Sequence, residues 1–196
     1  MNIFKQSATI TSQRDVLLHS ELTKKILMCL GLAVITGLSA QMKWYIPGNP
    51  VPFTMQTAAV ILSALWLKKW AGLSQLFYLI LGCLGVPWFA NYTGGMNILF
   101  LPTAGYLIGF VFTGYVGGWF VEKYFSRFHF STFVGLFLIS VLFTHGFGLL
   151  YLSSWMHFTH QTGSSMTYLL TKGTLPFLLF DLFKIMLVTG LYSNKA

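Results

Sequence analysis

An acidic and a basic residue lie three positions apart in an apolar segment near the C-terminus. Asp181 and Lys184 are the only charged residues of the segment 175–191. On a helix, positions i and i+3 share a face, so each charge lowers the other's cost of leaving water. A lone ionisable side chain in a bilayer costs about 2.5–3.5 kcal/mol even on lenient scales, and such residues mark substrate or ion paths. The alternative is a salt bridge that only fixes helix packing.

The composition predicts an integral membrane protein. Of 196 residues, 55% are hydrophobic and only 8% are charged, whereas soluble proteins carry about a quarter charged residues. The net charge is +8, but the basic residues flank apolar segments and form no continuous patch. The expected partner is therefore the lipid bilayer and not nucleic acid. Cys29 and Cys83 fall in apolar segments and predict buried thiols rather than a disulfide.

The expected fold class is an all-α integral membrane protein with six transmembrane helices. The apolar segments that predict them are residues 26–41, 57–67, 71–88, 104–121, 132–152 and 173–192. Residues 1–23 are more polar and lack the apolar stretch of a signal peptide. We therefore expect a cytoplasmic N-terminal arm, 1–23, followed by a membrane domain, 24–196.

The basic residues predict the orientation of these helices. With six spans, nine of the twelve Lys and Arg residues fall on one side. They are Lys5, Arg14, Lys24, Lys25, Lys68, Lys69, Lys123, Arg127 and Lys195. Because Lys and Arg are enriched in cytoplasmic loops, we expect a multi-pass plasma-membrane protein with both termini in the cytoplasm.

Two of the segments on the opposite side are unusual. Residues 44–56 and 89–103 carry almost no charge but are interrupted by proline or glycine, so they suit neither solvated linkers nor helices. Irregular backbone near membrane depth is tolerated where it is packed in protein or lines a cavity. We expect re-entrant or lid-like extracellular loops over an outward-facing pocket. The alternative is a pair of interfacial loops with Trp44, Tyr45, Trp88 and Tyr92 as belt aromatics.

Three motifs in order resemble those of the BioY family, the biotin-capturing S components of energy-coupling-factor (ECF) transporters. They are PVPFTMQT at 50–57, PTAGYLIGF at 102–110 after a Gly-Gly pair at 94–95, and PFL at 176–178 leading to Asp181 and Lys184. The chain departs from the family pattern at Leu101 and Ala104, where glycine is usual. The resemblance covers about residues 25–191. It implies a protein without enzymatic activity that captures biotin at the outer face, with a coupling subunit and ATPase subunits as partners.

Biotin has a ureido group with two N–H donors and a carbonyl acceptor, an apolar ring, and a carboxylate on a flexible chain. For this ligand we expect Asp181 to accept N–H bonds, and Lys184 to contact the ligand or hold Asp181. Polar and aromatic side chains are expected to complete the wall. They are Asn91, Tyr92, Tyr106, Tyr78, Thr54 and Gln56, with Gly94 and Gly95 allowing close backbone approach. For Thr54 and Gln56 the alternative is capping of the second helix, and for the glycines a plain turn.

The first helix carries a face of small residues at Ala33, Gly37 and Ala40. Such faces let membrane helices approach closely. The resemblance implies that this face docks onto the coupling subunit, and packing within the bundle is the alternative. No phosphate-binding loop motif occurs in the sequence, so any ATP hydrolysis is expected to come from a partner chain.

We expect neither a metal nor a cofactor, with biotin as the transported ligand. His157 and His160 lack a nearby carboxylate or cysteine to complete a metal site. His145 is interpreted as a buried core histidine, with a place in the cavity wall as the alternative.

Other functions stay open at this point. One is a membrane-embedded enzyme with Asp181 as general base, for which only His145 and Lys184 offer a second group. The other is a proton-coupled vitamin carrier that depends on protonation of Asp181. The sequence also leaves the oligomeric state open, a homo-oligomer included.

Overall fold

The computed structural model describes residues 2–124, 129–159 and 165–193, and it is almost entirely helical. The α-helices are α1 (Asn2–Gln41), α2 (Gln56–Leu67), α3 (Ala71–Cys83), α4 (Ala104–Tyr124), α5 (His129–Ser140), α6 (Gly146–Phe158), α7 (Met166–Gly173) and α8 (Leu175–Ser193). Shorter helical turns are η1 (Lys68–Trp70), η2 (Ala90–Tyr92), η3 (Met96–Phe100) and the π-helical turn η4 (Val141–His145). A small hairpin pairs β1 (Lys43–Trp44) with β2 (Phe53–Thr54) in antiparallel register.

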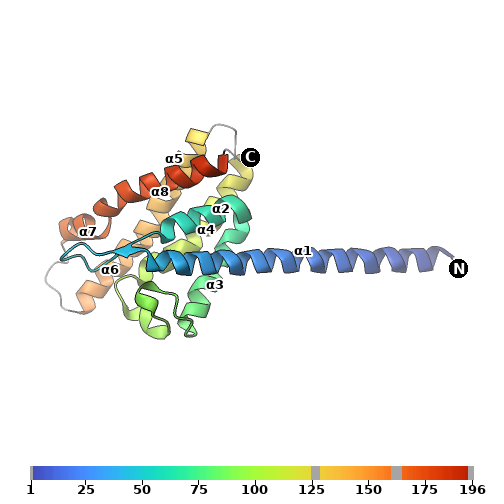
Figure 1. Cartoon of the computed structure of the whole chain (residues 1–196), viewed down its shortest axis with the longest axis horizontal. Helices are drawn as coiled ribbons and strands as arrows, with labels where there is room; N and C mark the ends of the chain where they lie inside the picture. The colour runs from blue at the N-terminus through green and yellow to red at the C-terminus, as the bar shows by residue number, and fades with distance from the viewer. Residues whose placement is uncertain (1, 125–128, 160–164, 194–196) are drawn as a thin grey trace.

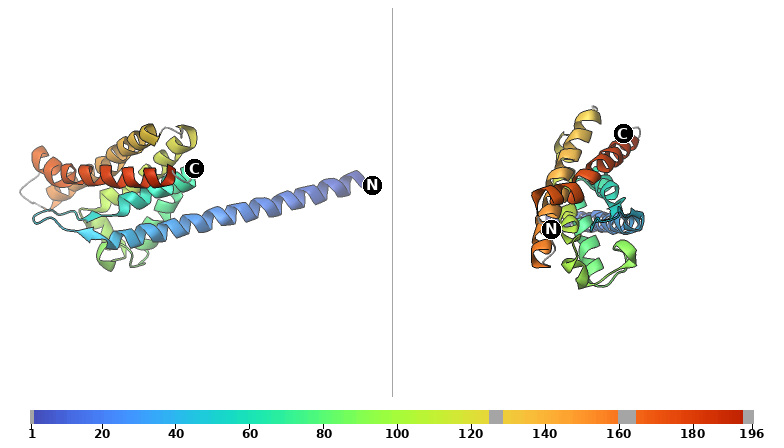
Figure 2. Two further views of the ribbon diagram at one scale, coloured as in Figure 1. Left: turned by 45° about the horizontal axis from the view of Figure 1, so that its top comes forward. Right: turned by 90° about the vertical axis from the view of Figure 1, so that its left-hand side faces the viewer.

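The helices form one bundle, and α1 extends well beyond it (Figure 1). The first part of α1 runs away from the other helices in Figure 1 and in the left view of Figure 2. Residues 2–23 continue α1, which is one helix of 40 residues. The apolar segment predicted a helix start near residue 26, since only the apolar part carries the signal of a membrane span. The cytoplasmic arm stays a prediction.

Within the described residues, four helical segments are long and apolar enough to cross a membrane. They are His19–Gln41, Ala104–Tyr124, Phe130–Phe158 and Thr167–Tyr192. The helices α2 and α3 have 12 and 13 residues. At 1.5 Å per residue each is about 20 Å long, which is shorter than the hydrocarbon core of roughly 30 Å. The structure thus has several apolar membrane helices, with a pair of short helices where two of the spans were predicted.

The central helix is α4, whose span is 61% buried, against 28–33% for the other three. It contacts α2, α3, α5 and α6. Glycines make these contacts close, because a Cβ on Gly109 would lie 2.6 Å from the carbonyl oxygen of Phe143 and one on Gly114 3.0 Å from that of Ala71. The backbones around α4 therefore lie closer together than larger side chains would allow.

The small residues of α1 face the inside of the bundle. Ala33 and Ala40 are fully buried, and a Cβ on Gly37 would lie 2.8 Å from the Cβ of Trp88. These three positions are therefore covered by the chain itself. The prediction of a partner-docking face at these positions is not supported, and the alternative of packing within the bundle accounts for them. The exposed face of α1 carries large apolar side chains instead, among them Leu27 and Leu38.

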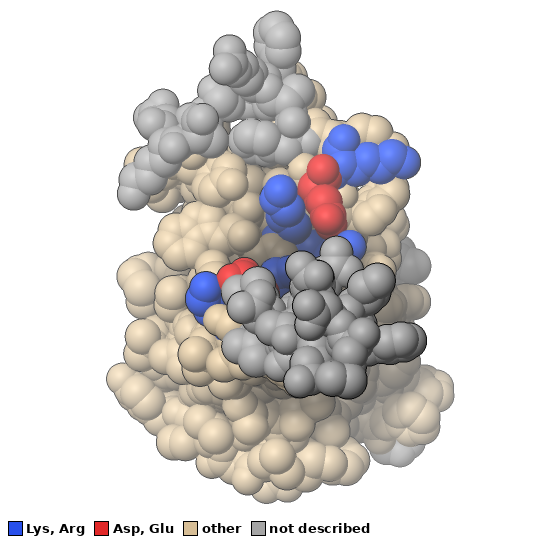
Figure 3. Space-filling model, turned by 90° about the vertical axis from the view of Figure 1, so that its right-hand side faces the viewer, with Lys and Arg blue, Asp and Glu red and all other residues tan. Residues whose placement is uncertain are grey.

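Charged side chains gather at the end of the bundle from which α1 projects (Figure 3). Three lysines from separate elements mark this end. Lys25 Nζ lies 5.5 Å from the ring centre of Trp70, Lys69 Nζ lies 3.7 Å from Glu122 Oε1, and Lys123 Nζ lies over the ring of Trp119. The α2–α3 connection and the end of α4 thus meet α1 at one end, which is the arrangement that the charge pattern predicted.

The close packing of α4 leads to a first prediction. Gly109→Ala should lower the melting temperature of the detergent-solubilised protein, because the added methyl group meets backbone atoms and overpacking costs about 1–3 kcal/mol. The matched control is Gly31→Ala in α1, where an added Cβ meets nothing within 4 Å. The control should melt at the wild-type temperature or slightly higher, since alanine favours a helix over glycine. Equal melting temperatures of the two variants would contradict the role given to α4.

Candidate functional site

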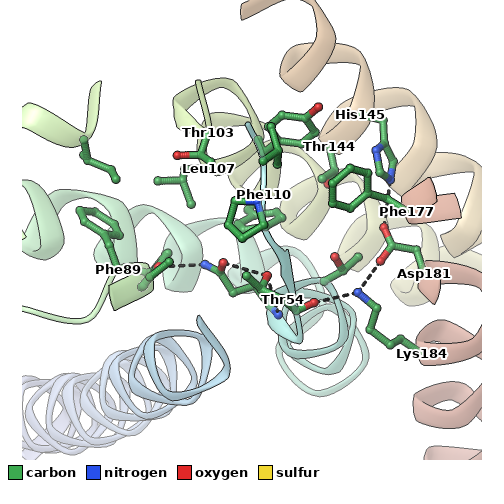
Figure 4. A pocket seen from close by; sticks show the side chains of 18 residues that line it. Thr54, Phe89, Thr103, Leu107, Phe110, Thr144, His145, Phe177, Asp181 and Lys184 are labelled. Carbon is green, nitrogen blue, oxygen red and sulfur yellow. Dashed lines mark hydrogen bonds and ion pairs between the residues drawn. The ribbon is translucent and has the colours of Figure 1, made fainter. Parts of the chain in front are cut away.

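A cavity lies among α2, α3, α4, η4 and α8, where the β-hairpin and the loop before α4 also meet (Figure 4). The space between its lining side chains, including the opening, has a volume of about 600 Å³. This figure counts open space at the mouth, and the room in which the centre of a water molecule could lie is about 60 Å³. The cavity is therefore narrow. Its wall is mostly apolar, with polar groups gathered on α8 and at the start of α2.

The helix α8 places a buried ion pair in the cavity wall. Lys184 Nζ donates hydrogen bonds to Asp181 Oδ1 at 2.6 Å and to the carbonyl oxygen of Thr54 at 2.8 Å. Asp181 is 3% exposed and Lys184 is 7% exposed. The two residues predicted to do the chemistry are therefore paired, and the pair contributes no net charge to the cavity.

A third polar residue completes this network. His145 Nε2 lies 2.9 Å from Asp181 Oδ2, and the imidazole is 3% exposed in the same cavity wall. In Figure 4 the dashed lines run from His145 through Asp181 and Lys184 to Thr54. The sequence favoured a core histidine that does not line the cavity, because nothing in it places residue 145 beside residue 181. The clue in the sequence was the position of His145 inside an apolar segment, because an ionisable side chain there needs a polar partner.

A second polar group lies at the start of α2. Gln56 Nε2 donates to Tyr78 Oη at 2.8 Å, and Thr54 Oγ1 donates to Gln56 Oε1 at 3.0 Å. All three residues line the cavity. The N-cap of α2 is Met55, without a side-chain cap, but Thr54 Oγ1 accepts from the N–H of Gln56 at 3.4 Å at the start of the helix. Thr54 therefore contacts the first turn of α2 as well as the cavity, as the capping alternative expected for it.

Aromatic rings form much of the remaining wall. The Tyr106 hydroxyl donates to the carbonyl oxygen of Gly173 at 2.7 Å, which fixes the ring. Phe177 stacks on Phe53 with ring centres 4.2 Å apart, and Phe89 meets Tyr78 edge to face at 5.3 Å. The sequence analysis named Tyr106 and Tyr78 but not Phe177, although Phe177 belongs to the third motif.

Four other predicted site residues lie outside the cavity lining. Asn91 Nδ2 donates to Tyr45 Oη at 2.9 Å, and Tyr92 is 72% exposed. A Cβ on Gly94 would lie within 3 Å of the backbone of residues 85 and 86. Gly95 has φ +98°, and its N–H donates to Gly82 O at 2.8 Å. The two glycines therefore shape the loop, as the turn alternative expected.

This loop is tied to two helices of the bundle. Gln41 at the end of α1 donates to the carbonyl oxygens of Phe89 at 2.9 Å and Trp88 at 3.2 Å, and accepts from the N–H of Tyr92 at 3.2 Å. On α6, Trp155 Nε1 donates to Phe100 O at 2.8 Å, and the Tyr151 hydroxyl donates to the carbonyl oxygen of Leu99. These bonds hold the loop over the cavity. Four residues of the loop form part of the cavity wall: Phe89, Ala90, Ile98 and Thr103.

Among the described residues, no group of three His, Cys, Asp or Glu side chains could hold a metal ion. His157 lies in the last turn of α6, while His160 lies outside the described residues.

Fold and site together define a multi-pass membrane protein with a buried ion pair in the wall of a narrow, mostly apolar cavity. The chain matches the family model described as "BioY family" over residues 7–195. It therefore belongs to the BioY family.

Curated relatives and a solved structure agree with this assignment. The chain is 36% identical to the biotin transporter BioY of Thermotoga maritima, over 78% of this chain and 85% of the relative. It is 33% identical to biotin transporter BioY2 of Lactococcus lactis subsp. cremoris, over 87% of this chain and 88% of the relative. It also shares its fold with a crystal structure of the S component for biotin from an ECF-type ABC transporter. The TM-score is 0.77 at 22% identity, over 89% of this chain and 92% of the other.

The role of Gln41 as an anchor can be tested without a ligand. Gln41→Leu should raise amide hydrogen exchange across residues 88–92 by about tenfold or more, because the loop loses a donor and an acceptor that tie it to α1. The matched control is Tyr45→Phe, which removes only the hydroxyl that accepts an exposed hydrogen bond from Asn91 and should leave exchange nearly unchanged. Wild-type exchange in the Gln41 variant would show that the other contacts alone hold the loop.

Proposed function

We propose that this chain is the biotin-binding membrane component of an ECF transporter, which captures biotin from the outer side and delivers it inward. The observation that carries the proposal is the buried Asp181–Lys184 pair in the wall of a narrow, mostly apolar cavity, in a chain of the BioY family. The names of the relatives and of the solved structure supply the ligand.

The cavity matches the chemistry of biotin. The ureido group needs acceptors for N–H and a donor for its carbonyl oxygen, and Asp181 and Lys184 offer both kinds of group. The ring needs an apolar wall, which Phe177, Phe89 and Tyr106 supply. Thr54, Gln56 and Tyr78 add polar groups on the opposite side. We assign ligand binding to these residues and do not extend it to Asn91 or Tyr92.

The proposed topology has six membrane helices, with the short α2 and α3 as a hairpin, and both termini in the cytoplasm. The clustered lysines at the end where α1 projects support this orientation, because basic residues concentrate on the cytoplasmic side. The β-hairpin and the loop 89–103 then lie at the outer end of the cavity. We propose that they are the lids through which biotin enters.

The energy for transport would come from partner chains. The sequence has no phosphate-binding loop, so we propose an ATPase pair and a coupling subunit as partners. The small residues of α1 are buried within the chain, so they do not offer these partners a docking surface.

Direct titration tests the ligand. Biotin should bind the purified protein in the nanomolar range, about −12 kcal/mol, and quench or enhance tryptophan fluorescence. Trp88 is a suitable reporter because its indole N–H donates to Tyr78 O at 3.0 Å, next to the cavity. Desthiobiotin, which keeps the ureido edge, should compete, whereas lipoic acid, which lacks a ureido group, should not. Absence of saturable biotin binding by well-folded protein would refute the proposal.

The ion pair gives a second test. Asp181→Asn should weaken biotin binding by roughly 30- to 1000-fold, because losing a charged hydrogen bond and leaving a partner unpaired costs on the order of 2–4 kcal/mol. Lys184→Met should weaken it too, and the double variant should lose less than the sum, since the two groups share one network.

The control for this test lies on the same helix. Thr189→Val removes a buried hydroxyl that bonds only within α8, to Ile185 O at 2.7 Å and Met186 O at 3.1 Å, and it should leave affinity unchanged. Melting temperature and affinity are measured on the same samples. An Asp181→Asn variant that melts lower but binds biotin normally would make the pair purely structural.

A further inference from the structure

His145 has one nitrogen in use and one without a partner. Its Nε2 lies 2.9 Å from a carboxylate oxygen of Asp181, which can only accept, so Nε2 carries the hydrogen. Asp181 and Lys184 already balance each other, and a protonated imidazole would add an unbalanced positive charge to a buried site. In the neutral ring Nδ1 is then a bare acceptor. It has no hydrogen-bond partner among the described residues, although it is fully enclosed.

The surroundings hold this acceptor in the cavity wall. His145 ends the π-helical turn η4, and such turns frequently occur at functional sites. Gly109 of α4 permits the turn to approach, since a Cβ there would lie 2.7 Å from the Cα of Thr144. The imidazole lies edge to face with the ring of Tyr106, and the two ring centres are 6.2 Å apart. The centre of the imidazole is also 6.2 Å from the ring centre of Phe177. The ring is therefore held by contacts on several sides.

No neighbouring group supplies the missing donor. The Tyr106 hydroxyl donates to Gly173 O, and the Thr144 hydroxyl is paired with Thr113 at 2.8 Å. Lys184 directs its ammonium to Asp181 and Thr54. A buried acceptor in a cavity wall, with no donor among the residues that the structure describes, is a binding feature, because the occupant of the cavity can supply the donor.

We propose that Nδ1 of His145 accepts a hydrogen bond from an N–H group of the bound ligand, so that His145 selects ligands with a ureido or amide N–H. The inference rests on the proposed function, in which that group is a ureido N–H of biotin. It gives Asp181 a second role, because its carboxylate holds the imidazole in the tautomer that leaves Nδ1 free to accept.

Two substitutions separate the nitrogens of the ring. In His145→Gln the side-chain amide occupies the place of Nε2, so the bond to Asp181 is kept and the Nδ1 acceptor is lost. In His145→Asn the amide oxygen occupies the place of Nδ1, so an acceptor is kept and the bond to Asp181 is lost. Biotin affinity is measured by tryptophan fluorescence, with the melting temperature of each variant as the measure of folding.

The inference predicts opposite profiles for the two variants. His145→Gln should keep a near wild-type melting temperature but bind biotin about 10- to 100-fold more weakly. His145→Asn should melt lower but keep more of the affinity. Wild-type affinity in a folded His145→Gln protein would overturn the inference while leaving the proposed function intact. Failure of the wild-type protein to bind biotin would overturn both.

Discussion

The site is organised by the need to satisfy a buried carboxylate and a buried ammonium group inside an apolar bundle. Asp181 and Lys184 are bonded to each other at 2.6 Å, but one partner is not enough for either group. The second carboxylate oxygen is bonded to His145, and the ammonium reaches the backbone carbonyl of Thr54. Each additional bond lowers the cost of burial. In meeting this requirement, α8 is joined to η4 and to β2, which are distant from it in the sequence.

The remaining structure places those elements within reach of one another. The glycines of α4 allow α3 and the π-helical turn to approach it closely, and this brings His145 to the cavity. The Tyr106 hydroxyl on α4 bonds to Gly173 just before α8. Gln41, Tyr151 and Trp155 hold the loop before α4. The cavity is thus the result of close helix packing on one side and anchored loops on the other.

The two departures from the family pattern are accommodated locally. Leu101 is 44% exposed, so its side chain adds little bulk inside the bundle. Ala104 is fully buried at the start of α4, where its N–H donates to Leu101 O at 3.0 Å. Neither residue lines the cavity among the described residues. Biotin recognition as proposed for this chain therefore does not require glycine at these two positions.

The sequence by itself determined the features that depend on local geometry and composition. The i, i+3 spacing placed Asp181 and Lys184 on one face, the apolar segments predicted membrane helices, and three motifs led to the BioY family. Six of the ten predicted ligand residues line the cavity, which are Thr54, Gln56, Tyr78, Tyr106, Asp181 and Lys184. Only the tertiary structure placed His145 beside Asp181 and buried the small face of α1. The physical reason is that membrane helices are apolar on most faces, so their periodicity does not say which face turns inward. Contacts between helices are set by close packing and by partners for buried polar groups, and these come from distant parts of the chain.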